Sequence, residues 1–403
     1  MKYIVVLGDG MADYAVREFG GKTVLDAAYK PNMDYMSAHG ELGLVKTVPD
    51  GMKPGSDVAN LSVMGYDTGK CYSGRSPLEA ASIGVKLRDS DVTFRANLVT
   101  LSDDEPYENK TMLDYSAGEI STEEAAELID AVEKELHTDL IHFYSGVSYR
   151  HLLVWDGGSL NVNLTPPHDI SDKKIGGHLP EGENADKLLE MMKKSEIILK
   201  NHPVNKKRIA EGKNPATSIW LWGEGSKPQL ENFKEKYGLN ASVISAVDLI
   251  KGIAVCAGMK SIDVEGATGN WDTNFDGKAQ AALDALTSDG ADLVYIHMEA
   301  PDECGHQGDA EKKKLSVELI DEKVVGFLRK KLGELGIDYK MLIMPDHPTP
   351  ISLKTHVSDP VPYVIYKSYD ETGSQLDYNE KNAAKTGIYT PIGHELMKHF
   401  IDG

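Results

Sequence analysis

The sequence predicts an α/β fold built on a parallel sheet, with a smaller α+β domain inserted into it. Short β-rich apolar runs alternate with helical patterns towards both ends of the chain, which is typical of a parallel sheet covered by helices on both faces. Residues 92–213 lack that alternation. The chain has 403 residues, 41% of them hydrophobic, enough for two or three domains with real cores. We therefore expect a discontinuous core of residues 1–91 and 214–403 and an inserted domain of residues 92–213.

The strands expected in the core are short, apolar and rich in β-branched residues. They are Tyr3–Leu7, Ile219–Trp222, Leu293–His297, Lys340–Met344 and Pro362–Tyr366. Between them, residues 278–286 and 313–332 carry apolar side chains three and four positions apart, as a helix packed on a sheet does. These two segments are expected to be helical.

The inserted domain has its own pattern. Residues 94–101 and 110–115 are expected to form a hairpin, and residues 141–144 and 151–154 further strands. Ser121 followed three residues later by Glu124 is a capping box, and the apolar stripe after it predicts a helix.

Charge and composition exclude several classes of partner. The chain has 43 Lys and Arg against 63 Asp and Glu, a formal net charge of −20. This charge repels nucleic acids and anionic membranes, and no basic run offsets it, so neither is an expected partner. No apolar run approaches the roughly 20 residues that cross a bilayer. The absence of a secretory pattern at the start, with only three widely spaced cysteines, favours a cytoplasmic protein.

Potential metal ligands follow several of the expected strands. They are Asp9, Asp302, His306, Asp346, His347 and His356. Asp302 and His306 are four residues apart, which places both on one side of a helical turn. Taken singly, an Asp-Gly pair is usually a plain turn and a lone histidine usually a surface or core residue. Because side chains converge beyond the carboxyl ends of parallel strands, the set together predicts a site for two divalent cations.

A serine at the start of a helix is the candidate nucleophile. In Pro54-Gly55-Ser56-Asp57, Gly55 permits a sharp turn and Ser56 falls in the first turn of the helix that follows. Exposed amides at such a position attract a phosphate oxygen. The alternative is that Ser56 only caps the helix, which from the local pattern alone is the more frequent role.

The order of these segments resembles the alkaline phosphatase superfamily and, more closely, the archaeal-type cofactor-independent phosphoglycerate mutases. The similarity extends over nearly the whole chain. It includes Gly65-Tyr66-Asp67, Ser73-Gly74-Arg75, Phe94-Arg95-Ala96-Asn97, Tyr149-Arg150-His151, Asn201-His202-Pro203-Val204-Asn205 and Gly266-Ala267-Thr268-Gly269.

The resemblance implies roles for the candidate residues. Ser56 would be the nucleophile that is transiently phosphorylated, sharing one metal with Asp9, Asp346 and His347. The second metal would be held by Asp302, His306 and His356. The resemblance implies two divalent ions, Mn²⁺ first and Zn²⁺, Mg²⁺ or Co²⁺ otherwise, and no 2,3-bisphosphoglycerate. The residues implied to hold the rest of a small phosphorylated substrate are Arg75, Arg95, Arg150 and His151, each with a surface salt bridge as the alternative.

The implied reaction is the interconversion of 3-phosphoglycerate and 2-phosphoglycerate through phospho-Ser56. One segment departs from the family pattern, because Tyr115 and Glu119 stand where two arginines are expected. Loss of two cations favours an alternative acceptor, so an ATP-dependent homoserine kinase that uses the same metal site is the runner-up. The remaining alternatives, in that order, are a metallophosphatase and a non-catalytic binding protein that retains the fold.

Overall fold

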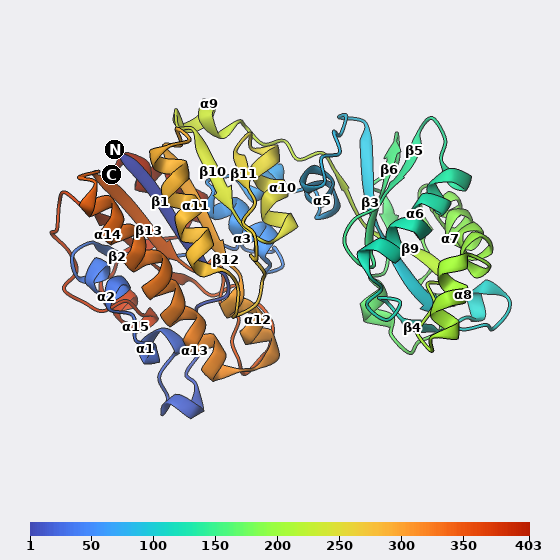
Figure 1. Cartoon of the computed structure of the whole chain (residues 1–403), viewed down its shortest axis with the longest axis horizontal. Coiled ribbons are helices and arrows are strands. Elements are labelled where there is room, and N and C mark those ends of the chain that lie inside the picture. Colours follow the sequence, from blue (N-terminus) through green and yellow to red (C-terminus); the bar gives the residue numbers. More distant parts are fainter. The chain divides into compact units, whose positions relative to one another are not determined.

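The computed structural model describes residues 1–403, which divide into two compact units (Figure 1). The larger unit comprises residues 1–72 and 229–403, and the smaller one residues 73–228. The smaller unit covers more of the chain than the inserted domain expected from the sequence, residues 92–213. At its C-terminal end this is because β9 (Ser218–Ser226) pairs antiparallel with β3 (Asp91–Leu101). The apolar run at Ile219–Trp222 is therefore a strand of the smaller unit and not of the core sheet.

An eight-stranded sheet forms the centre of the larger unit, in the order β11-β10-β12-β1-β13-β14-β2-β15. Its strands, in that order, are Lys260–Ile262, Ala241–Ile244, Leu293–Met298, Lys2–Gly8, Tyr339–Met344, Val361–Lys367, Glu41–Val45 and Tyr389–Thr390. The first five run parallel, as expected. β14 runs antiparallel to both of its neighbours, which differs from the expectation, because an apolar run does not encode the direction of a strand.

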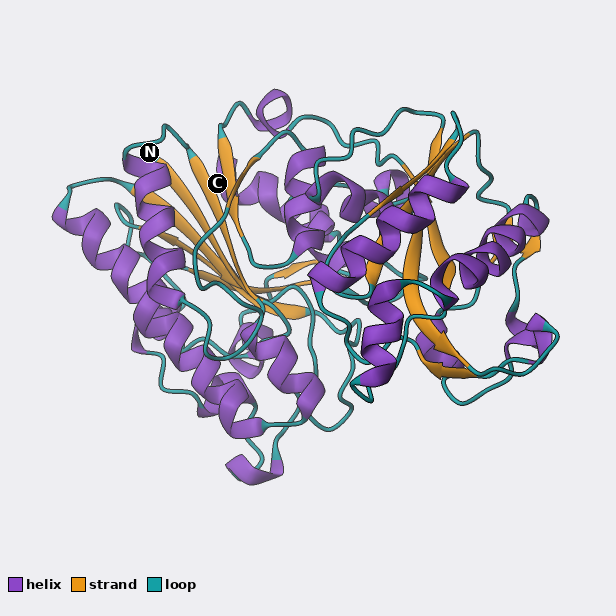
Figure 2. Ribbon diagram, turned by 45° about the vertical axis from the view of Figure 1, so that its right-hand side comes forward, coloured by secondary structure: helices purple, strands orange, loops and turns teal.

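Helices cover both faces of this sheet (Figure 2). On one face Ile4 and Val6 of β1 pack in a buried cluster with residues of α11 and α14. On the other face the ring of Tyr3 lies 5.8 Å from that of Phe400 in α16. The helices of the larger unit are α1 (Val24–Ala27), α2 (Pro31–Ala38), α3 (Ser56–Val63), α4 (Thr68–Cys71), α9 (Phe233–Tyr237), α10 (Asp248–Cys256), α11 (Phe275–Thr287), α12 (Ala300–Gln307), α13 (Ala310–Leu319), the π-helix η5 (Ile320–Gly326), α14 (Phe327–Glu334), α15 (Glu380–Lys385) and α16 (Leu396–Asp402).

The smaller unit is built on an antiparallel sheet in which β3 contacts β4, β6 and β9, and β6 contacts β5. Its other strands are β4 (Met112–Asp114), β5 (Ile141–Tyr144), β6 (Arg150–Asp156), β7 (Val162–Asn163) and β8 (Glu181–Gly182). Its helices are α5 (Ser76–Ser82), α6 (Thr122–Leu136), α7 (Ala185–Lys200) and α8 (Pro203–Ala210). The expected hairpin is β3 with β4, and the expected helix after Ser121 is α6.

Only half of the expected capping box forms at α6. Ser121 Oγ accepts a hydrogen bond from Glu124 N at 3.3 Å. The Glu124 carboxylate instead binds Arg208 Nη1 at 2.5 Å, which ties α6 to α8.

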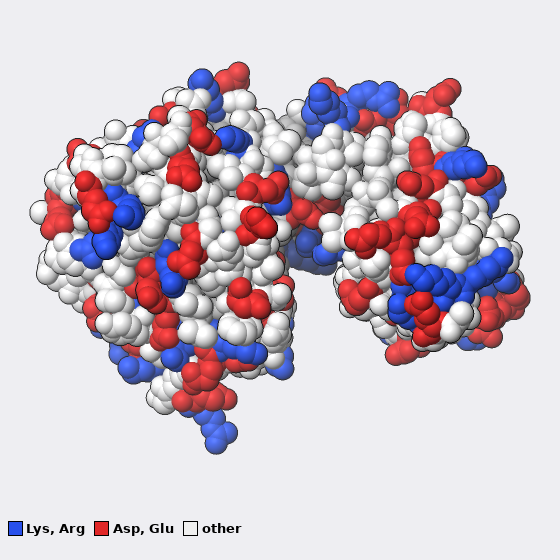
Figure 3. Space-filling view, viewed as in Figure 1, with Lys and Arg blue, Asp and Glu red and all other residues white.

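Charged side chains of both signs are interspersed on the surface drawn in Figure 3. None of the helices has both the length and the apolar character needed to cross a membrane.

Candidate active site

Three neighbouring strands place the candidate ligands at one edge of the large sheet. Asp9 directly follows β1, and Asp346 and His347 follow β13, which lies beside β1. Asp302 lies in the first turn of α12, directly after β12 on the other side of β1. All three strands run parallel, so their carboxyl ends meet at the same edge, as the sequence predicts.

Asp9, Asp346 and His347 form one group of buried ligand atoms. His347 Nε2 lies 3.5 Å from Asp9 Oδ1 and 3.4 Å from Asp346 Oδ2. Asp9 Oδ1 is buried and accepts no hydrogen bond. Burial, and then the nearby carboxylates of Asp346, Asp302 and Glu299, raise the pKa of Asp9 well above its usual range. An orphaned carboxylate oxygen among like charges fits a bound cation.

Asp302, His306 and His356 form the second group. Asp302 Oδ2 lies 3.2 Å from His306 Nε2, and Asp302 Oδ1 lies 3.4 Å from His356 Nε2. Burial raises the pKa of Asp302, but hydrogen bonds from both histidines outweigh it and hold this pKa well below its usual range. The same hydrogen bond to Asp302 raises the pKa of His306 to about 9.

The second group also fits a divalent cation. The two Nε2 atoms of His306 and His356 are only 2.9 Å apart, while His306 Nδ1 contacts the carbonyl oxygen of Lys354 at 3.0 Å. A proton on Nδ1 leaves Nε2 as the free ligand, an arrangement common in histidines that bind metals. The groups adjoin, since the rings of His347 and His356 are 4.1 Å apart and ligand atoms of Asp302, His347 and His356 also lie close together.

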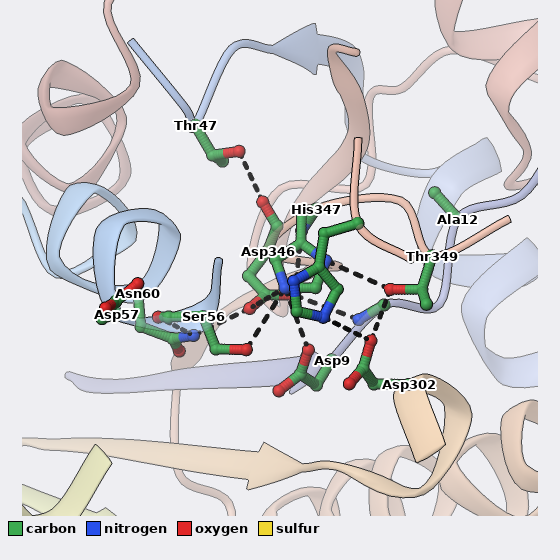
Figure 4. A network of polar contacts seen from close by, with 12 residues as sticks. Asp9, Ala12, Thr47, Ser56, Asp57, Asn60, Asp302, Asp346, His347 and Thr349 are labelled. Atoms are coloured by element: carbon green, nitrogen blue, oxygen red, sulfur yellow. Dashed lines mark hydrogen bonds and ion pairs between the residues drawn. The ribbon is translucent and has the colours of Figure 1, made fainter. Parts of the chain in front are cut away.

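Ser56 is the first residue of α3, and Gly55 occupies the N-cap position. Ser56 is therefore not the N-cap residue, and its Oγ lies 3.2 Å from His347 Nε2. Figure 4 shows Ser56, Asp9 and Asp302 around His347. The serine hydroxyl therefore lies beside the first ligand group, at a helix N-terminus.

Several buried polar residues that hold the ligands in place were not assigned from the sequence. Asn60 donates from Nδ2 to Asp346 Oδ2 and to the carbonyl oxygen of Ser56, both at 2.8 Å. His297 Nε2 lies 3.0 Å from Asp9 Oδ2. A histidine within an apolar strand, and an asparagine one helical turn after Ser56, were the available signals.

The three candidate arginines gather on one side of β3 in the smaller unit. Arg95 Nε donates to Glu79 Oε2 and Arg75 Nε to Glu79 Oε1, each at 3.0 Å. The Arg95 guanidinium lies 4.3 Å from the centre of the Trp222 ring. Burial lowers the pKa of Arg95, Glu79 raises it, and the neighbouring cations of Arg75 and Arg150 lower it further. The Glu79 carboxylate therefore binds two guanidinium groups, and the third, that of Arg150, acts on Arg95 through its charge.

His151 lies apart from these arginines. Arg150 and His151 are neighbours on β6, so their side chains point to opposite faces of the sheet. Arg150 is exposed opposite Asn97, whereas His151 is buried opposite Ala96, its Nδ1 accepting a hydrogen bond from Gly146 N at 3.1 Å. The geometry supports Arg150 better than His151 as a ligand-binding residue.

The two residues that depart from the expected pattern border this arginine cluster. The ring of Tyr115 lies 5.9 Å from that of Tyr149, and the guanidinium of Arg150 lies 5.6 Å from the Tyr149 ring centre. The charge of Glu119 also acts on Tyr149, whose pKa is raised chiefly by burial.

Comparison with known proteins gives a consistent result. The family model for 2,3-bisphosphoglycerate-independent phosphoglycerate mutase matches residues 37–205. A probable 2,3-bisphosphoglycerate-independent phosphoglycerate mutase from Geobacter sulfurreducens is 51% identical over 403 residues, covering 100% of both chains. The 2,3-bisphosphoglycerate-independent phosphoglycerate mutase from Methanosarcina barkeri is 51% identical over 388 residues, covering 96% of each chain.

Solved structures share the fold. The PH0037 protein from Pyrococcus horikoshii superposes with a TM-score of 0.83 at 29% identity, covering 100% of this chain and 96% of that one. A cofactor-independent phosphoglycerate mutase from Thermoplasma acidophilum gives a TM-score of 0.69 at 24% identity, covering 100% and 99%.

Proposed function

The chain belongs to the 2,3-bisphosphoglycerate-independent phosphoglycerate mutase family, and from this premise we propose that it interconverts 3-phosphoglycerate and 2-phosphoglycerate through a phosphorylated Ser56. The observation that carries the proposal is the position of Ser56 Oγ, at the N-terminus of α3 and 3.2 Å from His347 in the first ligand group.

The proposed reaction has two balanced halves. First, Ser56 Oγ forms a bond to the phosphorus of 3-phosphoglycerate as the bond to the substrate C3 oxygen breaks. Ser56 loses its hydroxyl proton, and the departing oxygen gains one. The glycerate then turns, and its C2 oxygen forms a bond to phosphorus as the bond between phosphorus and Ser56 Oγ breaks. The C2 hydroxyl loses a proton in this half, and Ser56 Oγ gains one.

The chain provides the environment for these steps. Two divalent cations, when bound by the two ligand groups, would stabilise charge on the phosphoryl oxygens and lower the pKa of the Ser56 hydroxyl. The amide groups in the first turn of α3 and the dipole of that helix favour the negative charge of a phosphoserine. Asn60 orients Asp346 and the Ser56 backbone through its two donated hydrogen bonds.

We assign substrate binding to Arg75, Arg95 and Arg150. A guanidinium group can bind a phosphate or carboxylate through two parallel hydrogen bonds, and glycerate phosphates carry both anions. The Arg95 guanidinium is held in place by an ion pair with Glu79 and by contact with the Trp222 ring.

Two finer expectations remain predictions: manganese as the native ion and a cytoplasmic location. The homoserine kinase alternative has no support among the relatives described above, which carry the mutase name.

A paired assay tests the proposal. Purified protein with Mn²⁺ receives 3-phosphoglycerate in an enolase-coupled reaction and, separately, ATP with homoserine. We expect turnover in the first reaction only. Ser56→Ala should abolish turnover and the phosphoserine detected by mass spectrometry after an acid quench, whereas Ser62→Ala, on the same helix, should retain both. Full activity of Ser56→Ala, or turnover with homoserine alone, would contradict the proposal.

A further inference from the structure

A fully buried lysine lies outside the set of residues that the proposed reaction uses. Lys313 belongs to α13 and its side chain is 0% exposed. Its Nζ donates to Asp13 Oδ2 at 2.7 Å and to the carbonyl oxygens of Thr349 and Ala12 at 2.8 and 3.2 Å. The three acceptors match the three donors of an ammonium group.

The two carbonyl groups belong to the two loops that carry the first ligand group. Ala12 follows Asp9 in the loop after β1, and Thr349 follows His347 in the loop after β13. The loops also bind each other directly, because Thr349 N donates to the Ala12 carbonyl oxygen at 3.3 Å. Lys313 therefore clamps these loops from a third element, α13.

Thr349 continues this contact to the ligands themselves. Its hydroxyl donates to Asp302 Oδ1 and lies 3.3 Å from His347 Nδ1. In Figure 4 Thr349 lies between Ala12 and Asp302. Lys313 fixes the backbone of Thr349 and so determines where the Thr349 hydroxyl contacts Asp302 and His347, one ligand from each group.

The junction is packed too tightly to shift without consequence. A Cβ atom at Gly10 would lie 2.5 Å from both Asp302 Oδ1 and Thr349 Oγ1, and one at Gly305 would lie 2.7 Å from the Thr349 carbonyl oxygen. A displacement of Thr349 would therefore be transmitted to Asp302.

The charge of Lys313 is balanced locally by Asp13. This carboxylate is buried and also accepts hydrogen bonds from Tyr14 N at 2.8 Å and Ile351 N at 3.2 Å. Buried ion pairs often contribute little net stability because both charges lose their hydration. A fixed geometry is a better explanation for this pair than stability.

We propose that Lys313 is a positioning residue of the cation site, which holds the Ala12 and Thr349 carbonyl groups and thereby orients Asp302 and His347. The inference rests on the proposed function, since it concerns the same pair of ligand groups. It adds a residue from α13, which supplies no ligand.

Binding of Mn²⁺, measured by isothermal titration and by electron paramagnetic resonance, tests this role independently of turnover. The matched control is Lys30→Met, because Lys30 is another buried lysine of the larger unit, paired with Asp34 at 2.6 Å. Lys313→Met should weaken Mn²⁺ binding about 10- to 100-fold, the usual effect of losing a residue that orients a ligand. Lys30→Met should leave the Mn²⁺ dissociation constant within about twofold of the parent.

Removing Lys313 alone leaves the Asp13 charge buried and unpaired, so the double variant Lys313→Met with Asp13→Asn is measured in parallel. It removes both charges and should fold if the single variant does not, while Mn²⁺ binding stays weak. Folded variants that bind Mn²⁺ as tightly as the parent would overturn the role of Lys313 and leave the proposed function standing. A parent protein that binds none of Mn²⁺, Zn²⁺, Mg²⁺ and Co²⁺ would overturn both.

Discussion

Replacing Asn60 with leucine should destabilise the larger unit and slow the enzyme together. Asn60 is fully buried and uses its whole amide. Nδ2 donates to Asp346 Oδ2 and to the Ser56 carbonyl oxygen, and Oδ1 accepts from the Tyr295 hydroxyl at 2.6 Å. Leucine preserves the approximate volume but removes all three bonds.

The cost can be estimated bond by bond. A hydrogen bond to a charged group contributes about 1.5–3 kcal/mol and a neutral one about 1 kcal/mol. The Tyr295 hydroxyl, left buried without a partner, adds about 1–3 kcal/mol. Together Asn60→Leu should lower the free energy of unfolding by at least about 4 kcal/mol. Combining it with Tyr295→Phe removes the orphaned hydroxyl and should restore about 1–3 kcal/mol.

Urea unfolding in chelator, followed by circular dichroism, measures these free energies, and the coupled assay measures kcat. The control is Asn205→Leu in the smaller unit. Asn205 is equally buried and bonds only to the backbone of Leu199 and Ala216. It should lose comparable stability with kcat unchanged, whereas Asn60→Leu should lose about tenfold or more in kcat. A double variant no more stable than Asn60→Leu, or an Asn60→Leu protein with parental stability, would refute the reasoning.

Four further outcomes are expected. Burial lowers the pKa of His151 to about 3, so the unfolded chain binds more protons than the folded one between about pH 6.5 and 3, and the free energy of unfolding falls as the pH is lowered through that range. His151→Asn keeps an acceptor for Gly146 N and should make the free energy of unfolding depend less on pH there. An unchanged pH dependence would contradict this prediction. Asp302 raises the pKa of His306 to about 9, so the interaction between protonated His306 and Asp302 stabilises the metal-free protein fully below about pH 6.5, and this stabilisation is lost as pH rises through 9. Mn²⁺ binding near pH 7.5 should therefore release a proton from His306. Titration calorimetry in buffers of different ionisation enthalpy detects that proton. Gly10→Ala should cost about 1–3 kcal/mol at its positive φ of 60° and weaken Mn²⁺ binding, whereas an unchanged melting temperature and Mn²⁺ affinity would contradict the packing argument. Chelation should lower the melting temperature, since Mn²⁺ at 100 times its dissociation constant stabilises by about 2.7 kcal/mol, and equal melting curves with and without chelator would argue against a bound cation.

The sequence was sufficient to predict the positions of the three strands that precede the candidate ligands. β1, β12 and β13 were expected within one residue of their observed ends, because each is a short run composed mainly of apolar and β-branched residues. β2 and β10 were not anticipated, since Gly43 interrupts one and serine the other. The pairing of β9 with β3 depends on contacts more than a hundred residues apart in the chain, which no local pattern encodes.

The candidate ligands were accessible to sequence reasoning for a related reason. Strand ends can be located, and acidic and histidine side chains placed there are conspicuous. The side chains that orient them were not conspicuous, because Asn60, Tyr295 and Lys313 are ordinary helix or strand residues until tertiary packing buries them. The roles assigned to the ligands and arginines stay predictions until the assays above are made.

The interrupted larger unit has a consequence for how the polypeptide emerges from the ribosome. Each strand of the smaller unit finds its partners within residues 73–228, whereas β1 pairs with β12 and β13, nearly 300 residues or more downstream. The smaller unit is therefore fully synthesised before β12 and β13, the strands that pair with β1, have been made. We expect nascent chains stalled before β12 to expose that strand to chaperones.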